Sequence, residues 1–579
     1  MRNRTLTALG GVILALMAVV APPHPVATAA PAPWQWVRVF SDIAVAPNAY
    51  YSIPVYCPAG YTAITGGLEL PTLSRLQRNA EYRLEDSGGS AWFVSFENFS
   101  GSSGTARVVA ECARTSDLPA ISHNYAEFTA TGNQVWSGSV NCLNPGEVVL
   151  TGGVDWSNVN TRYLWASGPL WSGEGWQAFG RNSVAGAKMG VEVYCVDPSQ
   201  VPGYTRVEQT QIGVSNWETT VTCPLGTRIL NGGTEEGYAN ASYPHLNTWT
   251  ATGQYSERTF VRAWCVSAGS PTIAFNSPLP TLTDAEYQSF AFIGNDPAGF
   301  PTSFRCSLDG SSPTGCPGLY WVGPLSSGSH QLVVFNQTAD GRQSAVLTHQ
   351  WTVDLDPPSV SAPRLAQVTL ADGEIARWAA SDAVAGIDHH EAKYWRGRAN
   401  GVTVDWTQPA SWADLDSPLV RVPAMAAGDT LCLSVRAVDN VGHTSAWTTP
   451  RCTSRPYDDA DLTASPGWTR VSNAAYWNGT MTRTGVLDET LHGPSAKSRQ
   501  LGLLASVCPG CGSVVVKIGS TTIGSVSLDQ PTSRNKQVLL LPAFAEKTGV
   551  LTLTSATSGK SIRIDGLVTI RRPAAGPPW

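Results

Sequence analysis

A sequence unit that occurs three times in the first half of the chain restricts its fold more than any other feature. Each copy begins with a cysteine and a turn containing proline and glycine, runs through a short apolar stretch to a pair of glycines, and closes on a second cysteine. The first cysteines are Cys57, Cys142 and Cys223, so successive copies begin 85 and 81 residues apart. Short apolar and β-branched runs between turns, repeated at this period, predict three related β domains.

The glycine pairs mark positions where a strand has no ordinary side chains. They are Gly66-Gly67, Gly152-Gly153 and Gly232-Gly233. Glycine inside a strand is typical of a β-bulge or of a close approach by another backbone. We expect one of these two features at the same place in each domain.

Each copy also has one tryptophan downstream of its glycine pair. These residues are Trp92, Trp176 and Trp249. An exposed tryptophan can serve as a platform on which a sugar stacks, which is one interpretation. Their recurrence in register with the cysteines favours the other interpretation, an indole packed in the core near the disulfide. We therefore expect equivalent positions in three similar domains.

Twelve cysteines fall into neighbouring pairs along the chain, which predicts six disulfides, each within one module. The expected pairs are Cys57–Cys112, Cys142–Cys195, Cys223–Cys265, Cys306–Cys316, Cys432–Cys452 and Cys508–Cys511. Zinc and thiol redox chemistry are alternatives for Cys508-Pro509-Gly510-Cys511. No second ligand pair lies nearby, and a strand-like run follows where a redox motif has a helix. We expect no metal and no cofactor.

Residues 1–29 have the features of a signal peptide. Arg2 and Arg4 precede an apolar stretch, Leu6 to Val20, and Ala27-Thr28-Ala29 supplies small residues for cleavage. An uncleaved membrane anchor is the alternative, but the apolar stretch is short for a bilayer and no long one follows. We expect cleavage after Ala29 and a secreted, extracellular protein with no membrane span.

Composition indicates an all-β chain of several domains. Charged residues make up only 14%, and 55 Gly, 40 Pro and 21 Trp separate or occupy many short apolar runs. This pattern is typical of tandem β-sandwich domains. A net charge of −6 without basic clusters argues against nucleic acid as a partner.

The first half resembles the Cys-Pro-x-Gly…Gly-Gly repeats of secreted actinobacterial proteins, whose role is not understood. The motif reads Cys57-Pro58-Ala59-Gly60 in the first copy and Cys223-Pro224-Leu225-Gly226 in the third. The resemblance covers about residues 35 to 268 and implies export and β structure. We place the repeats at 30–113, 114–197 and 198–268.

Two immunoglobulin-like modules are expected next. Phe304 to Gly310, Cys316-Pro317 and Trp351 to Asp354 resemble a bacterial immunoglobulin-like repeat, placed at 269–356. Asp356-Pro357-Pro358 predicts a stiff joint. Residues 357–455 resemble a fibronectin type III-like or immunoglobulin-like module, on the pattern of Trp406, Trp412, Cys432 to Ala437, Trp447 and Cys452.

Residues 456–572 resemble a C-terminal actinobacterial domain that is similar to galactose-binding and carbohydrate-binding jelly rolls. The resemblance rests on Gly467-Trp468, on Tyr476-Trp477-Asn478-Gly479-Thr480 and on the end of the module, Gly559 to Gly566. It implies a β-sandwich with affinity for glycans, so Trp468, Tyr476, Trp477 and Asn478 are the candidate ligand-binding residues. Asp565 is expected to cap the last strand turn. A Pro-rich tail, 573–579, follows.

One cluster, Asp388-His389-His390-Glu391, invites a metal or acid–base interpretation. Neighbouring strand residues face opposite ways, and the spacing is not that of a zinc protease, so we expect a solvated strand start or loop. Calcium at Asp382 and Asp439 is an alternative to ordinary turn hydrogen bonding, which we favour.

No catalytic motif supports an enzyme: the chain has no nucleophile elbow, no His-Glu-x-x-His and no Walker loop. We expect a secreted, non-enzymatic binding or adhesion protein, with extracellular or cell-wall glycan or another surface protein as partner. The first alternative is a structural display or spacer protein without a small ligand. The second is an extracellular hydrolase whose carboxylates come together only on folding.

Overall fold

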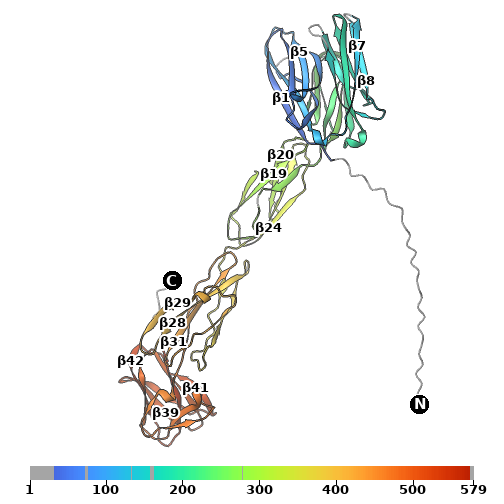
Figure 1. Cartoon of the computed structure of the whole chain (residues 1–579). Coiled ribbons are helices and arrows are strands. Elements are labelled where there is room, and N and C mark those ends of the chain that lie inside the picture. The colour runs from blue at the N-terminus through green and yellow to red at the C-terminus, as the bar shows by residue number, and fades with distance from the viewer. Residues whose placement is uncertain (1–31, 72–75, 132–133, 157–161, 277, 574–579) are drawn as a thin grey trace, which may run out of the picture.

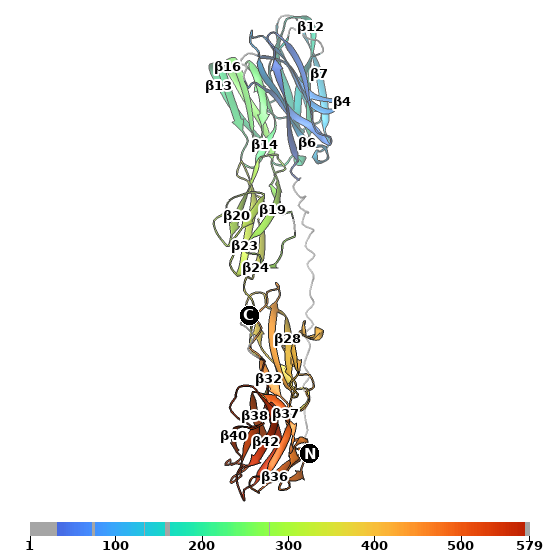
Figure 2. The same cartoon turned by 90° about the vertical axis from the view of Figure 1, so that its left-hand side faces the viewer.

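A computed structural model describes residues 32–71, 76–131, 134–156, 162–276 and 278–573. The expected signal peptide, 1–29, and the tail after Pro573 lie outside the described residues. The described part is all β apart from short 3-10 turns, as expected. None of these turns has the length and apolar character that a membrane-spanning helix needs. The modules form a chain, with the three repeats gathered at one end and the last module at the other (Figures 1 and 2).

Each repeat is built from two sheet segments that face each other over a core. The first repeat consists of β1 (Trp36–Val45), β2 (Tyr50–Tyr56), β3 (Tyr61–Glu69), β4 (Leu76–Asp86), β5 (Gly89–Asn98) and β6 (Gly104–Arg114). One segment has the order β1-β6-β3 and the other β2-β5-β4. The second repeat has the same order, β7-β12-β9 and β8-β11-β10.

The strands of the second repeat are β7 (Ser122–Thr131), β8 (Gln134–Asn141), β9 (Val148–Trp156), β10 (Arg162–Pro169), β11 (Gly175–Asn182) and β12 (Ala185–Val196). In the third repeat two long strands each serve both segments. Its strands are β13 (Thr205–Thr222), β14 (Thr227–Glu235), β15 (Ala239–His245) and β16 (Thr248–Ser267). Two short 3-10 turns, η1 (Thr115–Asp117) and η2 (Pro198–Gln200), connect the repeats.

The repeats are not independent domains, because the sheets of one repeat continue into those of the others. β4 of the first repeat pairs with β9 of the second, at Glu81 and Val154. β15 of the third pairs with β3 of the first, at Ser242 and Leu68. β10 of the second runs against β14 of the third. The three repeats therefore close into one body, which we call the ring (residues 32–268).

The glycine pairs explain how the ring closes. A Cβ on the first glycine of each pair would strike the core tryptophan of its own repeat, 2.3 Å from Trp92 at Gly66 for example. A Cβ on the second would strike the backbone of another repeat, 1.9 Å from the Ser242 carbonyl oxygen of the third repeat at Gly67. A register shift also lies just before each pair. Both the bulge and the close approach are confirmed.

The three tryptophans occupy equivalent buried positions, as predicted. Each lies opposite a valine of the neighbouring strand: Trp92 opposite Val55, Trp176 opposite Val140 and Trp249 opposite Val221. At the centre of the ring, Ile64, Leu150 and Leu230, one from each repeat, meet in a shared core with Trp34 and Trp36. This central core does not exist in a single repeat.

All six expected disulfides are present with the expected partners. They are Cys57–Cys112, Cys142–Cys195, Cys223–Cys265, Cys306–Cys316, Cys432–Cys452 and Cys508–Cys511. Each repeat has one, and each later module has one. Cys508 and Cys511 are therefore occupied by a disulfide bond and are not zinc ligands.

The immunoglobulin-like module (Ig-like module, 269–356) is a sandwich of two sheets with orders β17-β19-β22 and β18-β24-β23-β20-β21. Its strands are β17 (Thr272–Phe275), β18 (Leu282–Thr283), β19 (Gln288–Asn295), β20 (Thr302–Leu308), β21 (Thr314–Cys316), β22 (Leu319–Val322), β23 (Gly328–Thr338) and β24 (Leu347–Val353). Phe290 and Trp351 pack in its core.

The fibronectin type III-like module (FnIII-like module, 357–455) is centred on the sheet β29-β28-β31-β32. Its elements are β25 (Ser359–Val360), β26 (Ile375–Arg377), β27 (Ala380–Ser381), β28 (Ile387–Gly397), β29 (Thr403–Thr407), η3 (Ala410–Trp412), β30 (Leu419–Arg421), β31 (Thr430–Asp439) and β32 (Arg451–Ser454). β31 is almost wholly buried, between the core and the covering loops.

The module expected at 456–572, which we call the jelly roll, has a six-stranded and a five-stranded sheet, which enclose one large apolar core. Its first elements are β33 (Tyr457–Asp458), η4 (Asp459–Asp461), β34 (Thr463–Ala464), β35 (Thr469–Ser472), η5 (Trp477–Gly479), β36 (Thr480–Thr484) and β37 (Thr490–Ser498). The remaining strands are β38 (Gln500–Val507), β39 (Ser513–Ile518), β40 (Thr521–Ser527), β41 (Arg534–Leu540), β42 (Lys547–Ser555) and β43 (Ile562–Ile570).

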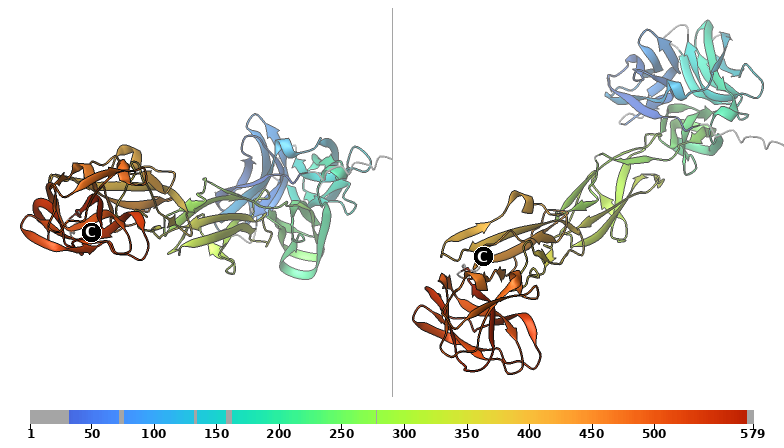
Figure 3. Two further views of the ribbon diagram at one scale, coloured as in Figure 1. Left: turned by 90° about the horizontal axis from the view of Figure 1, so that it is seen from below. Right: turned by 60° about the horizontal axis from the view of Figure 1, so that its bottom comes forward.

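Hydrogen bonds cross each joint between modules. The Trp36 N–H of the ring donates to the Pro297 carbonyl of the Ig-like module at 2.7 Å. The Ala385 N–H of the FnIII-like module donates to Asp354 Oδ2 at 3.0 Å. Thr569 Oγ1 of the jelly roll donates to the Gly428 carbonyl at 3.1 Å. The turned views in Figure 3 show the same succession of modules.

Candidate functional site

A pocket of about 670 Å³ lies where the FnIII-like module meets the jelly roll. One wall is the loop 424–427, which precedes β31 and presents three alanines and Met425. The opposite wall comes from the start of the jelly roll and includes Asp458, Asp461 and Asn478. Because its walls belong to two modules, the pocket depends on the joint between them.

Trp477 lines this pocket, but its indole is not a stacking surface. The side chain is only 5% exposed, and Nε1–H donates to the Leu370 carbonyl of the FnIII-like module at 2.9 Å. A sugar ring cannot stack on a buried face, so Trp477, one of the candidate ligand-binding residues, does not offer its ring to a sugar. The indole links the two modules instead.

The other candidate residues separate into different environments. Trp468 is 7% exposed and belongs to the core of the jelly roll, so it is not a ligand-binding residue. Tyr476 is half-buried, and its N–H donates to the Asn473 carbonyl at the start of η5. Asn478 is exposed in the pocket and takes a left-handed conformation, with φ of 50°. Of the four, only Trp477 and Asn478 line the pocket.

Asn478 is held in place by a carboxylate. Its Nδ2 donates to Asp458 Oδ2 at 2.7 Å. Asp458 also accepts the Ala460 N–H, while Asp461 accepts the Asp458 N–H, which completes a capping box on η4. Burial raises the pKa of Asp458, although these hydrogen bonds oppose it. The pocket wall is therefore an ordered set of hydrogen-bond acceptors with one exposed amide.

A second carboxylate, Asp459, lies behind this wall and is wholly buried. It accepts hydrogen bonds from Thr480 Oγ1 at 2.7 Å and Thr482 Oγ1 at 2.6 Å, and forms an ion pair with Arg470 at 3.1 Å. All of its partners come from the jelly roll. Asp459 therefore stabilises the start of the jelly roll and is not available to a ligand.

Asp565 has a role that the sequence did not predict. Both of its carboxylate oxygens accept the Trp477 N–H at 3.0 Å, so it holds η5 rather than capping the turn of its own strand. Burial raises its pKa to about 6, the Trp477 N–H opposes this, and the nearby Asp459 and Asp458 add to it. Asp458 and Asp459 are neighbours in the chain, but only folding brings Asp565 close to them, so sequence spacing carried no signal of this contact.

The rim of the pocket carries opposite charges. Arg455 and Asp372 form an ion pair there within the FnIII-like module. With Asn478 and Asp458, these groups can donate to and accept from the hydroxyl groups of a polar ligand. The arrangement is suited to hydrogen bonding and has no exposed ring on which a sugar could stack.

A separate aromatic face lies on the FnIII-like sheet. Trp406 is 37% exposed, and Lys393 Nζ lies 5.6 Å from its ring and 4.0 Å from that of Trp447. Arg436 lies 4.8 Å above the Trp447 ring. These residues form a row of alternating rings and cations. Both tryptophans were expected only as features of the fold. Lys393 on β28, which lies beside both rings, is the residue whose place in the sequence could have indicated this face.

The cluster Asp388-His389-His390-Glu391 lies at the start of β28, and its side chains divide between the two faces. His389 Nδ1 lies 2.8 Å from Asp388, and Glu391 pairs with Arg436 at 2.7 Å. His390 is buried against Trp378, so the expectation that the whole cluster is solvated is wrong for this residue. Glu391 pairs with Arg436 and His390 packs against Trp378, so these two side chains do not point toward one metal ion.

No known protein family profile and no curated protein matches the chain. Among solved structures, the fibronectin(III)-like modules of Clostridium thermocellum CbhA match with 16% identity over 32% of this chain and 93% of that one, at a TM-score of 0.19. The three N-terminal domains of the bacteriophage RB49 highly immunogenic outer capsid protein match at 10% identity, over 44% and 99%, with a TM-score of 0.22.

A third solved structure is the SGBP-B protein of the Bacteroides ovatus mixed-linkage glucan utilization locus, in complex with a mixed-linkage heptasaccharide. It matches at 12% identity, over 52% of this chain and 98% of that one, with a TM-score of 0.12. At these scores the similarities are too distant to assign this chain a family or a ligand.

Proposed function

We propose that this protein is a secreted, non-enzymatic adhesion or display protein, in which a stalk of sandwiches holds the ring away from the surface on which the stalk stands. The observation that carries the proposal is the joining of the modules end to end through hydrogen bonds at all three joints. Ordered joints keep the ends of the chain of modules apart, which is the property that a spacer requires.

An extracellular location is part of the same proposal. Six disulfides persist only in an oxidising environment, and the N-terminal 29 residues have the pattern of a signal peptide. The non-enzymatic character rests on the buried acids of the jelly roll, Asp459 and Asp565, which are both engaged in holding structure.

Small-angle X-ray scattering of the mature chain tests the spacer function. A compact protein of this length has a radius of gyration of about 25 Å. We expect a clearly larger value, and a distance distribution with a long tail that is unchanged by moderate salt. A compact particle, or a broad ensemble typical of freely hinged modules, would contradict the proposal.

Glycan binding at the pocket is a second candidate function. Its volume lies within the range of small-molecule sites, and Asn478 presents an exposed amide beside the buried Asp458. Recognition there would use hydrogen bonds to sugar hydroxyls, with Trp477 and Tyr476 supporting η5 rather than stacking. An oligosaccharide end fits this proposal better than a flat polymer surface.

Titration of the full chain with cell-wall and plant oligosaccharides tests whether the pocket binds glycan. Asn478→Gly keeps the left-handed backbone and removes the amide, so we expect it to weaken pocket binding about tenfold or more. Trp406→Ala is the matched control on the aromatic face and should leave pocket binding unchanged. If Trp406→Ala weakens glycan binding and Asn478→Gly does not, the site lies on the FnIII-like sheet. If the chain binds no glycan, only the display function remains.

A further inference from the structure

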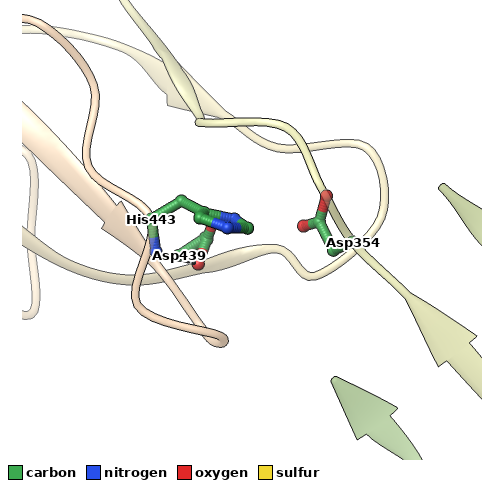
Figure 4. Close-up of side chains that lie close together, drawn as sticks. All are labelled: Asp354, Asp439 and His443. Atoms are coloured by element: carbon green, nitrogen blue, oxygen red, sulfur yellow. Dashed lines mark hydrogen bonds and ion pairs between the residues drawn. The ribbon is translucent and has the colours of Figure 1, made fainter. Parts of the chain in front are cut away.

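Three potential metal ligands from two modules meet at the joint between the Ig-like and FnIII-like modules. Asp354 follows β24 at the end of the Ig-like module, while Asp439 and His443 stand on either side of the turn after β31. Their ligand atoms all lie within 4.8 Å of one another. Figure 4 shows the Asp354 carboxylate approaching the other two side chains from the opposite side.

Asp439 is the strongest indication that something else binds here. The residue is 1% exposed, and its Oδ1 accepts the N–H groups of Val441 and His443, both at 2.9 Å. This turn bonding was expected from the sequence. Its Oδ2, however, is buried without a hydrogen-bond partner. A buried carboxylate oxygen left unpaired costs free energy unless a cation or donor occupies the space in front of it.

His443 Nδ1 is the atom that faces this oxygen. It lies 3.3 Å from Asp439 Oδ2, yet it too is buried without a hydrogen bond. Two ligands of one tetrahedral zinc ion, each about 2.0–2.1 Å from it, are about 3.3 Å apart. The pair therefore has the spacing of neighbouring ligands around an ion, without the geometry of a hydrogen bond.

Three carboxylates gather at the joint. Asp354 and Asp382 share the Ala385 N–H, so a third carboxylate adjoins the cluster. Among the described residues, no lysine or arginine forms an ion pair with Asp354, Asp382 or Asp439. Carboxylates gathered in a partly buried place need a cation, and an imidazole among the ligands favours zinc over calcium, which takes oxygen ligands.

We propose that Asp354, Asp439 and His443 bind one divalent transition-metal ion, Zn²⁺ first among them, and that this ion fastens the Ig-like module to the FnIII-like module. The fourth position is left to water or to Asp382. The connecting segment 354–358 and the hydrogen bond from the Ala385 N–H to Asp354 also join the two modules. An ion bound from both sides would fix the angle of the stalk at this point.

Calorimetric titration of the chelator-treated mature chain with ZnCl₂ tests the site. We expect one equivalent to bind, and binding to weaken at least tenfold in both His443→Gln and Asp439→Asn. Asp439→Asn keeps the Oδ1 acceptor of the turn, and the side chain of His443 is partly exposed, so neither change removes a fold-determining contact. CaCl₂ and MgCl₂ serve as competing probes.

His389→Ala is the control, because His389 is paired with Asp388 in the same module but lies outside the proposed site. It should bind zinc as the unmodified chain does. Limited proteolysis gives a second readout: Zn²⁺ should slow cleavage within 354–358 in the unmodified chain and in His389→Ala, but not in His443→Gln. Loss of binding in His389→Ala alone, binding of calcium at equal affinity, or no zinc binding would overturn the proposal.

Discussion

Three glycines of the ring lie where a single added Cβ would clash with the backbone of another repeat. Gly67 sits where the backbone of the third repeat crosses the first, and Gly153 and Gly233 sit at the equivalent crossings of the other repeats. The atoms that a side chain would meet are backbone atoms, which cannot rotate away as the end of a long side chain can. Each second glycine is therefore required by the assembly of the ring and not by a turn.

Gly67→Ala tests this directly. The new Cβ would fall 1.9 Å from the Ser242 carbonyl oxygen, so we expect the free energy of unfolding of the ring to drop by about 2–3 kcal/mol or more. Gly101→Ala is the matched control, because nothing lies within 4 Å of its Cβ position. Urea denaturation of both variants measures the difference, and equal stability would contradict the role of Gly67.

Asp565 makes the stability of the jelly roll depend on pH. Its pKa is raised from 3.8 to about 6 in the folded state, mainly by burial, so the folded domain binds this proton more tightly than the unfolded chain does. The free energy of unfolding should therefore fall as the pH rises from about 4 to about 6, and stay lower above that.

Asp565→Asn should remove this loss, since Asn Oδ1 can still accept the Trp477 N–H. We expect the variant to be more stable than the unmodified chain by about 1–2 kcal/mol at pH 7.5, with no gain at pH 4. Denaturation of the full chain at the two pH values, followed by the fluorescence of the jelly roll, measures this. An equal change at both values would show that the carboxyl charge is not the cause.

Strands of the ring depend on partners from other repeats. β4 reaches β9, β15 reaches β3 and β10 reaches β14, so each repeat completes the sheet of the next. The shared core of Ile64, Leu150 and Leu230 has the same dependence. A disulfide within each repeat restricts its unfolded chain but cannot replace these contacts.

A fragment of residues 32–113 should therefore be unable to fold cooperatively even with Cys57–Cys112 intact, because its seam strands and Ile64 would face water. The fragment 32–268 should unfold in a single sharp transition. Circular dichroism with thermal denaturation of both oxidised fragments compares them. A cooperative transition in the single repeat would show that the repeats fold independently.

At the scale of the whole molecule, hydrogen bonds across each joint connect the modules end to end. At the last joint Thr569 Oγ1 donates to the Gly428 carbonyl, the Arg571 N–H donates to Thr430 Oγ1, and Arg571 Nη1 donates to the Gly401 carbonyl at 2.8 Å. These groups are buried, so they couple the FnIII-like module and the jelly roll thermodynamically as well as sterically.

Thr569→Val preserves the shape of the side chain and leaves the Gly428 carbonyl without its donor. We expect a loss of about 1–3 kcal/mol at the joint. Calorimetry should show one joint transition for the FnIII-like module and the jelly roll in the unmodified chain, and two separate transitions in the variant. Thr554→Val, on a half-buried position of β42, is the control. Unchanged, coincident transitions would show that the joint is held by other contacts.

Features that depend on residues close together in the chain, or on the repeat period, could be predicted from the sequence. The pairing of cysteines in sequence order, the three equivalent tryptophans, the bulge at each glycine pair and the all-β class depend on residues near one another in the chain or on a repeat period, and all are confirmed. The turn hydrogen bonds of Asp382 and Asp439 were predicted for the same reason.

Features that depend on contacts between residues far apart in the chain could not be predicted from these patterns. The sequence around a tryptophan does not show whether its ring faces water or a neighbouring module. The ring of Trp477 is buried against the FnIII-like module, where it donates a hydrogen bond to Leu370, 107 residues away. The closure of three repeats into a ring, the proximity of Asp565 to Asp458, and the meeting of Asp354 with Asp439 and His443 follow from contacts between distant strands and modules. Residue order specifies which groups can interact, whereas burial and the distance between atoms, which depend on the folded chain, decide which of them do.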